Sequence, residues 1–572
     1  MLEESELPTM EEYFGSELID NDENDKVGVE NSCCGGGKTN ALVNEIHGRL
    51  KKSCVLVLSP TKELGYQIES RLQEGNTDKR EIRVINSDTV GETSTVSAVA
   101  SHGIKQYNYT NAFERGRKDQ ENPVVICTHK AFLNIPNALL SEWVIVFDEL
   151  PNLLDIEHWK FNISEMKTTV QNIIEVDKET KVAKLKITKE EAKVITSDAS
   201  DALGNKLKSL VSRIAENGSE VKMFSKEVDE EKGASFHYNA FHENARQSMV
   251  NATEVHILAA NFKDTLTALT LQHWGFKIQE SSIKAKHKVH SNTDRITIYP
   301  LLPEGKRFST SLINREYEGD HKELVADRLN MKVQGMLRDD FIYCYIKKMG
   351  ANFSPKSNKA TNVVEIPFDS RGKNDYFGFH KIAVLAHCNP NPVMSKNFTE
   401  LENITSIPAR EWRKAWDITN TYEMAYQLTA RTSARMIDST EPVEIIVPDM
   451  EYVKYLKEQF PDAVVDTDYA IYLPEQEDGR KTVKKTDKRR TPQSKKDLVI
   501  EKYKEGAATN TAIAKALGLA KTTVKNIIDE WSETWDYYYW CKDSYLILES
   551  VEEFFHQKRL QEEAELEESL IE

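Results

Sequence analysis

The 572-residue sequence contains no apolar run close to the roughly 18 residues that a membrane-spanning helix needs. Its amino terminus, Met-Leu-Glu-Glu-Ser-Glu, is acidic and lacks the basic start and apolar stretch of a secretory signal peptide. We therefore expect neither a membrane partner nor export. A chain of this length is expected to bury about three or four separate cores, because single domains rarely exceed a couple of hundred residues.

Cysteine is scarce and shows no metal-binding spacing. Cys33 and Cys34 are adjacent, and the other five are scattered at Cys54, Cys127, Cys344, Cys388 and Cys541. Such unpaired cysteines are typical of reducing compartments. We expect reduced thiols in a cytoplasmic protein.

Positive charge is in deficit, since the net charge is −17, and this argues against a passive nucleic-acid coat. Acidic residues concentrate at both ends, in residues 3–25 and 562–572. Residues 479–497, GRKTVKKTDKRRTPQSKKD, are the opposite and carry nine Lys or Arg. This stretch is either a solvated linker or a linker that also follows nucleic-acid phosphates.

Glycine is concentrated at one place near the amino terminus, in KVGVENSCCGGGKT (residues 26–39). The pattern predicts a strand, a glycine-rich turn and a helix that begins at Lys38, an arrangement whose backbone N–H groups and helix dipole bind phosphate. Lys38 would reach the β- and γ-phosphates of a nucleotide, and Thr39 would offer a hydroxyl to Mg²⁺. The candidate nucleotide-binding residues are Ser32, Gly35, Gly36, Gly37, Lys38, Thr39 and Asn40. The alternative is a glycine-rich surface loop that binds nothing.

Two adjacent carboxylates follow an apolar run in SEWVIVFDELPNLL (residues 141–154). The run at 144–147 is typical of a strand buried on both faces of a parallel sheet, and ligands bind at the carboxyl ends of such strands. Asp148 would hold Mg²⁺, and Glu149 would polarise the water that attacks the γ-phosphate. A solvent-facing acidic pair at a strand end is the alternative.

Further stretches follow the loop in a fixed order: SPTKELGYQ (59–67), ICTHKAFL (126–133), HILAAN (256–261), FDSRGKND (368–375) and QLTARTSAR (427–435). Together with the loop and the acidic pair, they resemble the ordered motifs of superfamily 2 helicases. The resemblance implies two RecA-like motor lobes that use ATP and Mg²⁺. It assigns hydrolysis to Lys38, Glu149, Gln427, Arg431 and Arg435, and further nucleotide contacts to Gly372 and Asn374. It assigns nucleic-acid contacts to Pro60, Thr61, Lys62, Thr128 and Arg371.

The sequence also departs from that family. Pro151 stands where the acidic box usually ends in Asp or His, and it removes a polar link between the ATP site and the second lobe. Arg431 and Arg435 are one residue further apart than usual, and we favour Arg431 for the γ-phosphate. About 30 residues precede the loop, with no adenine-reading motif. The chain is therefore nearer to the divergent helicases of phages and plasmids than to DEAD-box RNA helicases.

These patterns divide the chain into five parts. The expected parts are an acidic segment (1–26), a first lobe (27–280) with an insertion at about 152–250, a second lobe (281–474), a basic linker (475–496) and a C-terminal domain (497–572). In the insertion we expect a strand pair and an amphipathic helix over 202–214. The second lobe should take strands from RITIYPLL, FIYCYI, VVEIPF, KIAVLAHC and VEIIVPD. One helix over 423–436 would put Gln427 and Arg431 on one face.

The C-terminal domain contains TAIAKALGLAKTTVKNIIDEW (residues 511–531), a helix-turn-helix pattern in a small, mostly helical domain. Ile513, Ala514, Leu517, Val524 and Ile527 would lie inside, with Gly518 at the turn. The second helix would then expose Lys521, Thr522, Thr523, Lys525 and Asn526 to a major groove. The alternative is a helical hairpin without a DNA function. The aromatic stretch that follows is the core of a small hairpin or, less favoured, a platform for single-stranded bases, and an acidic helix ends the chain.

The function that these features predict is an ATP-dependent helicase or translocase acting on DNA, in phage or plasmid DNA replication or its initiation. It would bind single-stranded DNA along the motor and duplex DNA at the helix-turn-helix, and it would work with replication proteins in the bacterial or infected host cytoplasm. One alternative is a DNA-binding regulator that ATP switches without motor activity. Another is a restriction or packaging translocase.

Overall fold

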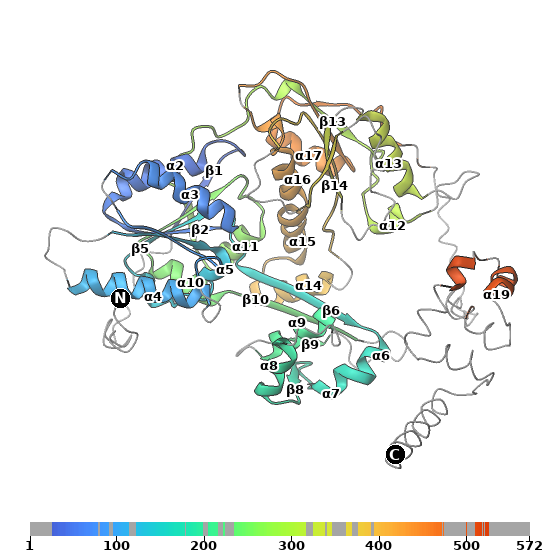
Figure 1. Cartoon of the computed structure of the whole chain (residues 1–572), viewed down its shortest axis with the longest axis horizontal. Helices are drawn as coiled ribbons and strands as arrows, with labels where there is room; N and C mark the ends of the chain where they lie inside the picture. Colours follow the sequence, from blue (N-terminus) through green and yellow to red (C-terminus); the bar gives the residue numbers. More distant parts are fainter. Residues whose placement is uncertain are drawn as a thin grey trace, which may run out of the picture. The chain divides into compact units, whose positions relative to one another are not determined.

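The structure is a computed structural model of the whole chain (Figure 1). It describes residues 26–77, 80–90, 95–113, 122–177, 179–197, 204–215, 221–223, 234–315, 324–337, 340–345, 362–368, 376–390, 394–436, 438–471, 473, 499, 510–517, 519 and 521–525. The chain divides into two compact units, residues 1–474 and 475–572. Among the described residues, no helix combines the length and the apolar character that crossing a bilayer requires.

The first lobe of unit 1 is built on a seven-stranded parallel sheet with the order β12-β1-β11-β5-β2-β4-β3. Its strands are β1 (Lys26–Asn31), β2 (Cys54–Ser59), β3 (Ile82–Ile85), β4 (Val124–Thr128), β5 (Trp143–Asp148), β11 (Glu254–Ala259) and β12 (Lys277–Glu280). Its longer helices are α2 (Lys38–His47), α3 (Lys62–Glu74), α4 (Val96–Phe113), α10 (Glu243–Asn251) and α11 (Leu266–His273). Alternate residues of β2 face opposite cores, which is why the strand reads as a continuous apolar run.

The second lobe is a six-stranded parallel sheet with the order β15-β14-β16-β17-β13-β18. Its strands are β13 (Ile296–Pro300), β14 (Phe341–Tyr345), β15 (Val363–Glu365), β16 (Lys381–Leu385), β17 (Val443–Val447) and β18 (Val464–Val465). Its helices are α12 (Thr310–Ile313), α13 (Val325–Met336), α14 (Met394–Thr405), α15 (Ala409–Asp417), α16 (Glu423–Thr429) and α17 (Met450–Gln459). The predicted α/β architecture of two parallel-sheet lobes is confirmed, as are the five predicted strands.

The single helix predicted over 423–436 is wrong. A π-helical turn (Ile418–Tyr422) runs into α16, which ends at Thr429, and Arg431 lies in a turn before a 3₁₀ helix (Ser433–Arg435). Threonine hydroxyl groups end the helix because they hydrogen-bond to backbone groups that would otherwise form helical hydrogen bonds. Thr432 Oγ1 donates to the Thr429 carbonyl (2.6 Å) and accepts from Ala434 N (3.2 Å). Gln427 and Arg431 therefore do not share a helix face.

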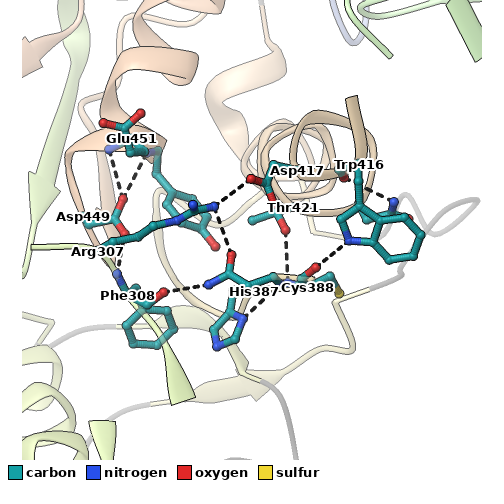
Figure 2. A network of polar contacts seen from close by, with 12 residues as sticks. Arg307, Phe308, His387, Cys388, Trp416, Asp417, Thr421, Asp449 and Glu451 are labelled. Atoms are coloured by element: carbon teal, nitrogen blue, oxygen red, sulfur yellow. Dashed lines mark hydrogen bonds and ion pairs between the residues drawn. The ribbon is translucent and has the colours of Figure 1, made fainter. Parts of the chain in front are cut away.

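Loops at the carboxyl ends of the second lobe's strands are fastened to its helices by the polar network of Figure 2. Asp449 caps α17 and also accepts from Phe308 N (2.7 Å). Arg307 donates to Asp417 Oδ2 at the end of α15 (2.8 Å), and Trp416 Nε1 donates to the Cys388 carbonyl (2.8 Å). The run of helix from α15 to α16 is thus held against the sheet, and this run faces the first lobe.

An insertion in the first lobe forms a long two-stranded arm. Its strands β6 (Leu154–Phe161) and β10 (Ala234–Phe241) pair in antiparallel along their whole length. The short strand β9 (Lys222–Met223) pairs with the other side of β10. They lead to a small body that contains α6 (Ile163–Glu165), a π-helical turn (Met166–Val170), α7 (Gln171–Ile173), β7 (Ile174–Val176), β8 (Ala183–Leu185), α8 (Lys189–Ser197) and α9 (Gly204–Ala215). The expected amphipathic helix is present as α9. The insertion also contains a strand pair, β7–β8, but only β8 lies in residues 179–218, the stretch whose sequence suggested the pair. The stretch assigned to the insertion also includes α10, whose side chains pack in the core of the first lobe.

The arm docks on α14 of the second lobe (Figure 1). Glu400 of α14 pairs with Lys222 (2.6 Å) and His237 (2.5 Å) of the arm. Burial alone would raise the pKa of Glu400, but these two hydrogen bonds lower it to about 2. Asn397 adds a buried amide bonded to Asn239 Oδ1 (3.0 Å). The insertion therefore joins the two lobes away from the glycine-rich loop.

In unit 2 the described residues form a small apolar cluster of Val499, Ile513, Ala514 and Val524, with Leu517 and Leu519 packed against it. Helix α19 (Asn510–Leu517) is followed by a helical segment at 521–525. Leu519 N donates to the Ala514 carbonyl (2.9 Å), a bond that closes a helix end. Lys521, Thr522, Thr523 and Lys525 are exposed. Gly518, Asn526, Ile527, the basic linker, the aromatic stretch and the acidic ends lie outside the described residues.

Candidate nucleotide site between the lobes

The glycine-rich loop connects β1 to α2, and each of its glycines has a structural reason. Gly35 (φ 81°) and Gly37 (φ 91°) adopt the left-handed conformation that side chains disfavour. A Cβ on Gly36 would lie 2.3 Å from the carbonyl oxygen of His287. The loop turns sharply into the N-terminus of α2, whose first N–H groups form a ready anion site. Ser32, where glycine is usual, is buried and its N–H bonds to the Ala259 carbonyl (3.1 Å).

The segment that connects the lobes, residues 281–292, lies directly along this loop. Cys33 N donates to the Lys288 carbonyl, and His287 N donates to the Gly36 carbonyl, both at 3.0 Å. Fully buried Glu30 of β1 accepts from Ala285 N (3.1 Å) and from Lys288 Nζ (2.6 Å). The connecting segment therefore shapes the loop, a role that no sequence motif indicated.

Lys38, Thr39 and Asp148 lie near one another beside the glycine-rich loop. Lys38 Nζ folds back over the loop and donates to the carbonyls of Ser32 (2.8 Å) and Cys33 (3.1 Å). Thr39 Oγ1 donates to Asp148 Oδ2 (3.2 Å), which joins the start of α2 to the end of β5. Asn40 points to the outer side of α2, where its Oδ1 accepts from Arg71 (3.0 Å).

Asp148 is buried, and its surroundings disfavour a bare negative charge. Burial, together with the neighbouring Glu149, raises the pKa of Asp148 to about 7, although Lys38 and Thr39 oppose the shift. A cation beside the carboxylate would reverse this penalty. Mg²⁺ usually takes only one or two protein oxygens and completes its shell with water and phosphate. The Asp148 carboxylate and the Thr39 hydroxyl fit that donor set.

Glu149 occupies the left-handed region (φ 81°), which is unusual for a residue with a side chain. Its N–H is fixed by the Leu258 carbonyl of the neighbouring strand β11 (3.0 Å). A backbone in this conformation costs about 1–3 kcal/mol and is kept where surrounding structure enforces it, commonly at functional sites. The bend sets the Glu149 side chain apart from that of Asp148.

Two residues of the second lobe, Tyr426 and Arg435, contact the glycine-rich loop, and a third, Arg431, is close enough to act on it electrostatically. The Tyr426 hydroxyl accepts from Cys34 N (2.9 Å) and bonds with His290 Nε2 (2.8 Å). Arg435 lies against Gly35, because a Cβ there would be 3.1 Å from its carbonyl oxygen and 3.4 Å from its Nε. Burial raises the pKa of the Cys34 thiol to about 11, and the charges of Lys38 and Arg431 oppose this rise. Both arginines are therefore near the loop.

A comparison of the two arginines tests which of them serves the γ-phosphate. We expect Arg431→Ala to lower ATP turnover roughly a hundredfold or more, because arginine stabilises charge on the transferring phosphoryl group. Nucleotide affinity should change much less. The matched control is Arg410→Ala on α15, whose side chain is largely exposed. Steady-state turnover and binding of a fluorescent ATP analogue measure the two effects, and a larger loss in Arg435→Ala would transfer the role to Arg435.

The predicted nucleic-acid residues of the first lobe lie at one edge of its sheet. Ser59, the last residue of β2, pairs in register with Thr128, the last residue of β4. Pro60, Thr61 and Thr128 therefore lie at the carboxyl ends of adjacent strands. The Thr61 and Thr128 hydroxyls cap α3 and the short helix α5 (His129–Phe132). Lys62 forms an exposed ion pair with Asp88 (2.5 Å). Arg371, Gly372 and Asn374 lie outside the described residues.

Sequence reasoning missed the residues of the second lobe that complete the site. Glu423 and Tyr426 are buried on α16, and both precede the predicted Gln427 within one helical turn. The available signal was the spacing of Glu423, Tyr426 and Gln427, which places all three on one side of a helix. Gln427 Nε2 donates to Glu423 Oε1 (3.0 Å).

Comparison with known proteins gives fold likenesses alone. No protein-family model and no curated protein matches the sequence. Among solved structures, S. tokodaii Xpd4 is similar at 14% identity, over 77% of this chain and 96% of that chain, with a TM-score of 0.42. S. cerevisiae Dbp5 bound to RNA and ADP BeF3 (11%, 77% and 85%, TM-score 0.30) and the DUF1998 helicase MrfA bound to DNA (10%, 77% and 48%, TM-score 0.30) are also similar. The fold assignment stands on the two parallel sheets themselves.

Proposed function

We propose that the chain is an ATP-driven helicase or translocase that acts on DNA. The observation that carries this proposal is the arrangement of the glycine-rich loop. Lys38 and the Thr39–Asp148 pair lie on the first lobe, and Arg431 and Arg435 approach the same loop from the second lobe. A nucleotide bound between two lobes favours their closure, and its hydrolysis releases them, which is the cycle of a stepping motor.

The chemistry follows from the positions of the side chains. Lys38 would leave the loop carbonyls and bind the β- and γ-phosphates, at the positive end of α2. Thr39 and Asp148 would hold Mg²⁺, which supplies positive charge against those phosphates. Glu149 would accept a hydrogen bond from the attacking water and orient it. The arginine of the second lobe would stabilise the charge that develops on the transferred group.

The exposed polar side chains of unit 2 support a second DNA contact. Lys521, Thr522, Thr523 and Lys525 stand on the helical segment that follows α19, and Asn526 continues it in the sequence. We propose that this segment reads duplex DNA as the second helix of a helix-turn-helix. A motor that carries its own duplex reader suits DNA replication or its initiation, at a chosen site, in the manner of phage and plasmid helicases.

A strand-displacement assay tests the motor. We expect the full chain to separate forked DNA only when ATP and Mg²⁺ are present, and to separate forked RNA far less. DNA should also stimulate ATP turnover. Nucleotide-dependent DNA binding without stimulated turnover or displacement would instead favour the regulator that ATP switches.

A further inference from the structure

Besides the docking of the arm on α14, the two lobes meet in a seam along the helical run from α15 to α16. Lys414 of α15 pairs with Asp264 (2.7 Å), and Thr419 Oγ1 accepts from Leu266 N (2.9 Å). Farther along the run, Tyr426 contacts Cys34 of the glycine-rich loop. Asp264 lies in the loop between β11 and α11, just after the HILAAN motif, and Leu266 is the first residue of α11.

A chain of hydrogen bonds, buried between Tyr455 and Glu423 and half-buried at its two ends, crosses the middle of this seam. Asn261 Nδ2 of the first lobe donates to the Tyr455 hydroxyl (2.7 Å), which donates to Glu423 Oε2 (2.6 Å). Gln427 donates to the other oxygen of Glu423. On the first-lobe side, Phe262 N bonds to Asn31 Oδ1 at the start of the glycine-rich loop (3.0 Å). The hydrogen-bonded chain thus runs from Asn261 to Gln427, and Phe262, the residue after Asn261, ties its first-lobe end to the last residue of β1.

We propose that Glu423 and Tyr455 are positioning residues that couple closure of the lobes to the orientation of the Gln427 amide. The inference rests on the proposed function, which places Gln427 in ATP hydrolysis. This chain also supplies the polar link that Pro151 cannot make, because proline has no polar side chain, and the Pro151 carbonyl bonds within the first lobe to Thr267 (2.8 Å).

The orientation of Gln427 follows from what Glu423 can accept. An ionised carboxylate accepts hydrogen bonds but donates none, so the Gln427 nitrogen must face it. The amide oxygen is then directed away from Glu423, and among the described residues this buried oxygen has no hydrogen-bond partner. Such an oxygen can accept from the attacking water when the lobes are closed on nucleotide.

The Tyr455 hydroxyl favours the ionised, accepting state of Glu423. Burial raises the pKa of Glu423 to about 7, and the hydrogen bonds from Tyr455 and Gln427 are the main effects that oppose the rise. Without the Tyr455 hydroxyl, the carboxyl group would bind a proton more readily and could donate to the Gln427 oxygen. The amide would then turn its nitrogen towards the nucleotide, where it cannot accept from water.

The test compares Tyr455→Phe with Tyr452→Phe in the full chain. Both tyrosines are buried on α17, but among the described residues the Tyr452 hydroxyl donates only to the Ala386 carbonyl, within the second lobe. We expect Tyr455→Phe to lower the kcat of DNA-stimulated ATP turnover about tenfold while the affinity for a fluorescent ATP analogue changes less than twofold. Tyr452→Phe should keep kcat within about twofold. Asn261→Ala combined with Tyr455→Phe should lose no more than the larger single loss, because both break one chain.

A second measurement does not depend on catalysis. Amide hydrogen exchange should increase in residues 260–266 and 418–429 of Tyr455→Phe, and in neither segment of Tyr452→Phe. Unchanged exchange in Tyr455→Phe would overturn the coupling even if the wild-type chain hydrolysed no ATP. Full kcat in Tyr455→Phe, or additive losses in the double variant, would overturn the role in positioning. Absence of wild-type turnover with the expected exchange would overturn the proposed function and keep the coupling between lobes.

Discussion

Replacing Lys38 with alanine is expected to reduce ATP turnover by roughly a hundredfold to a thousandfold, the usual loss when a donor to developing negative charge is removed. Alanine cannot neutralise charge on the β- and γ-phosphates. The fold should persist, because among the described residues the Lys38 ammonium group bonds only to the carbonyls of Ser32 and Cys33 in the loop, and no core contact depends on it. Turnover and circular dichroism of the purified variant measure the two effects.

The matched control is Lys52→Ala, an exposed lysine beyond the other end of α2. It should retain wild-type turnover. Glu149→Gln provides an independent check, because it should still bind ATP and yet turn it over slowly. Near-normal turnover in Lys38→Ala or in Glu149→Gln would remove the assignment of this loop as the hydrolysis site.

Ending the chain after Pro474 is expected to separate the two DNA activities. Unit 1 contains every motif of the proposed motor and should retain ATP turnover that DNA stimulates. Affinity for duplex DNA should fall by orders of magnitude, because the truncation removes the basic linker and the exposed helical segment at 521–525. Binding of labelled duplex, measured over a range of salt concentrations, gives the magnitude.

The salt dependence distinguishes the two removed parts. Contacts of the linker to phosphates should contribute roughly 0.9 units of log–log slope each, and the truncated chain should lose them. Replacing Lys521, Lys525 and Asn526 with alanine should instead reduce preference between sequences, by about 1–3 kcal/mol for each good base contact. Equal duplex affinity in the full and truncated chains would assign unit 2 to protein docking.

Local patterns predicted much of this structure because their physical causes are local. The apolar run at 144–147 lies in strand β5, as predicted, because no polar residue interrupts burial on either face. The three glycines before Lys38 predicted the turn because only glycine adopts the conformations of Gly35 and Gly37 readily. The pairing of Thr39 with Asp148 followed from the rule that ligands bind at the carboxyl ends of parallel strands.

Contacts across long separations in sequence could not be predicted in the same way. Cys34 and Tyr426 are 392 residues apart, and no periodicity relates them. Nothing in the residues next to Tyr455 indicates that its hydroxyl bonds to Asn261, which is 194 residues away in the sequence. The end of α16 at Thr429 depends on hydroxyl groups of Thr429 and Thr432 that compete with the helix, which hydrophobic spacing does not reveal.

The docking of the arm on α14 limits how the lobes can move. A rigid body that is attached at one point can rotate about any axis through that point. With a second attachment, it can rotate only about the line that joins the two points. The connecting segment 281–292 is one attachment of the second lobe, and the contacts of Glu400 with Lys222 and His237 are another. If both persist while nucleotide is released, the second lobe swings about one fixed axis, so each turnover would repeat the same displacement in the same direction. The geometry of the arm would then set the length of the stroke.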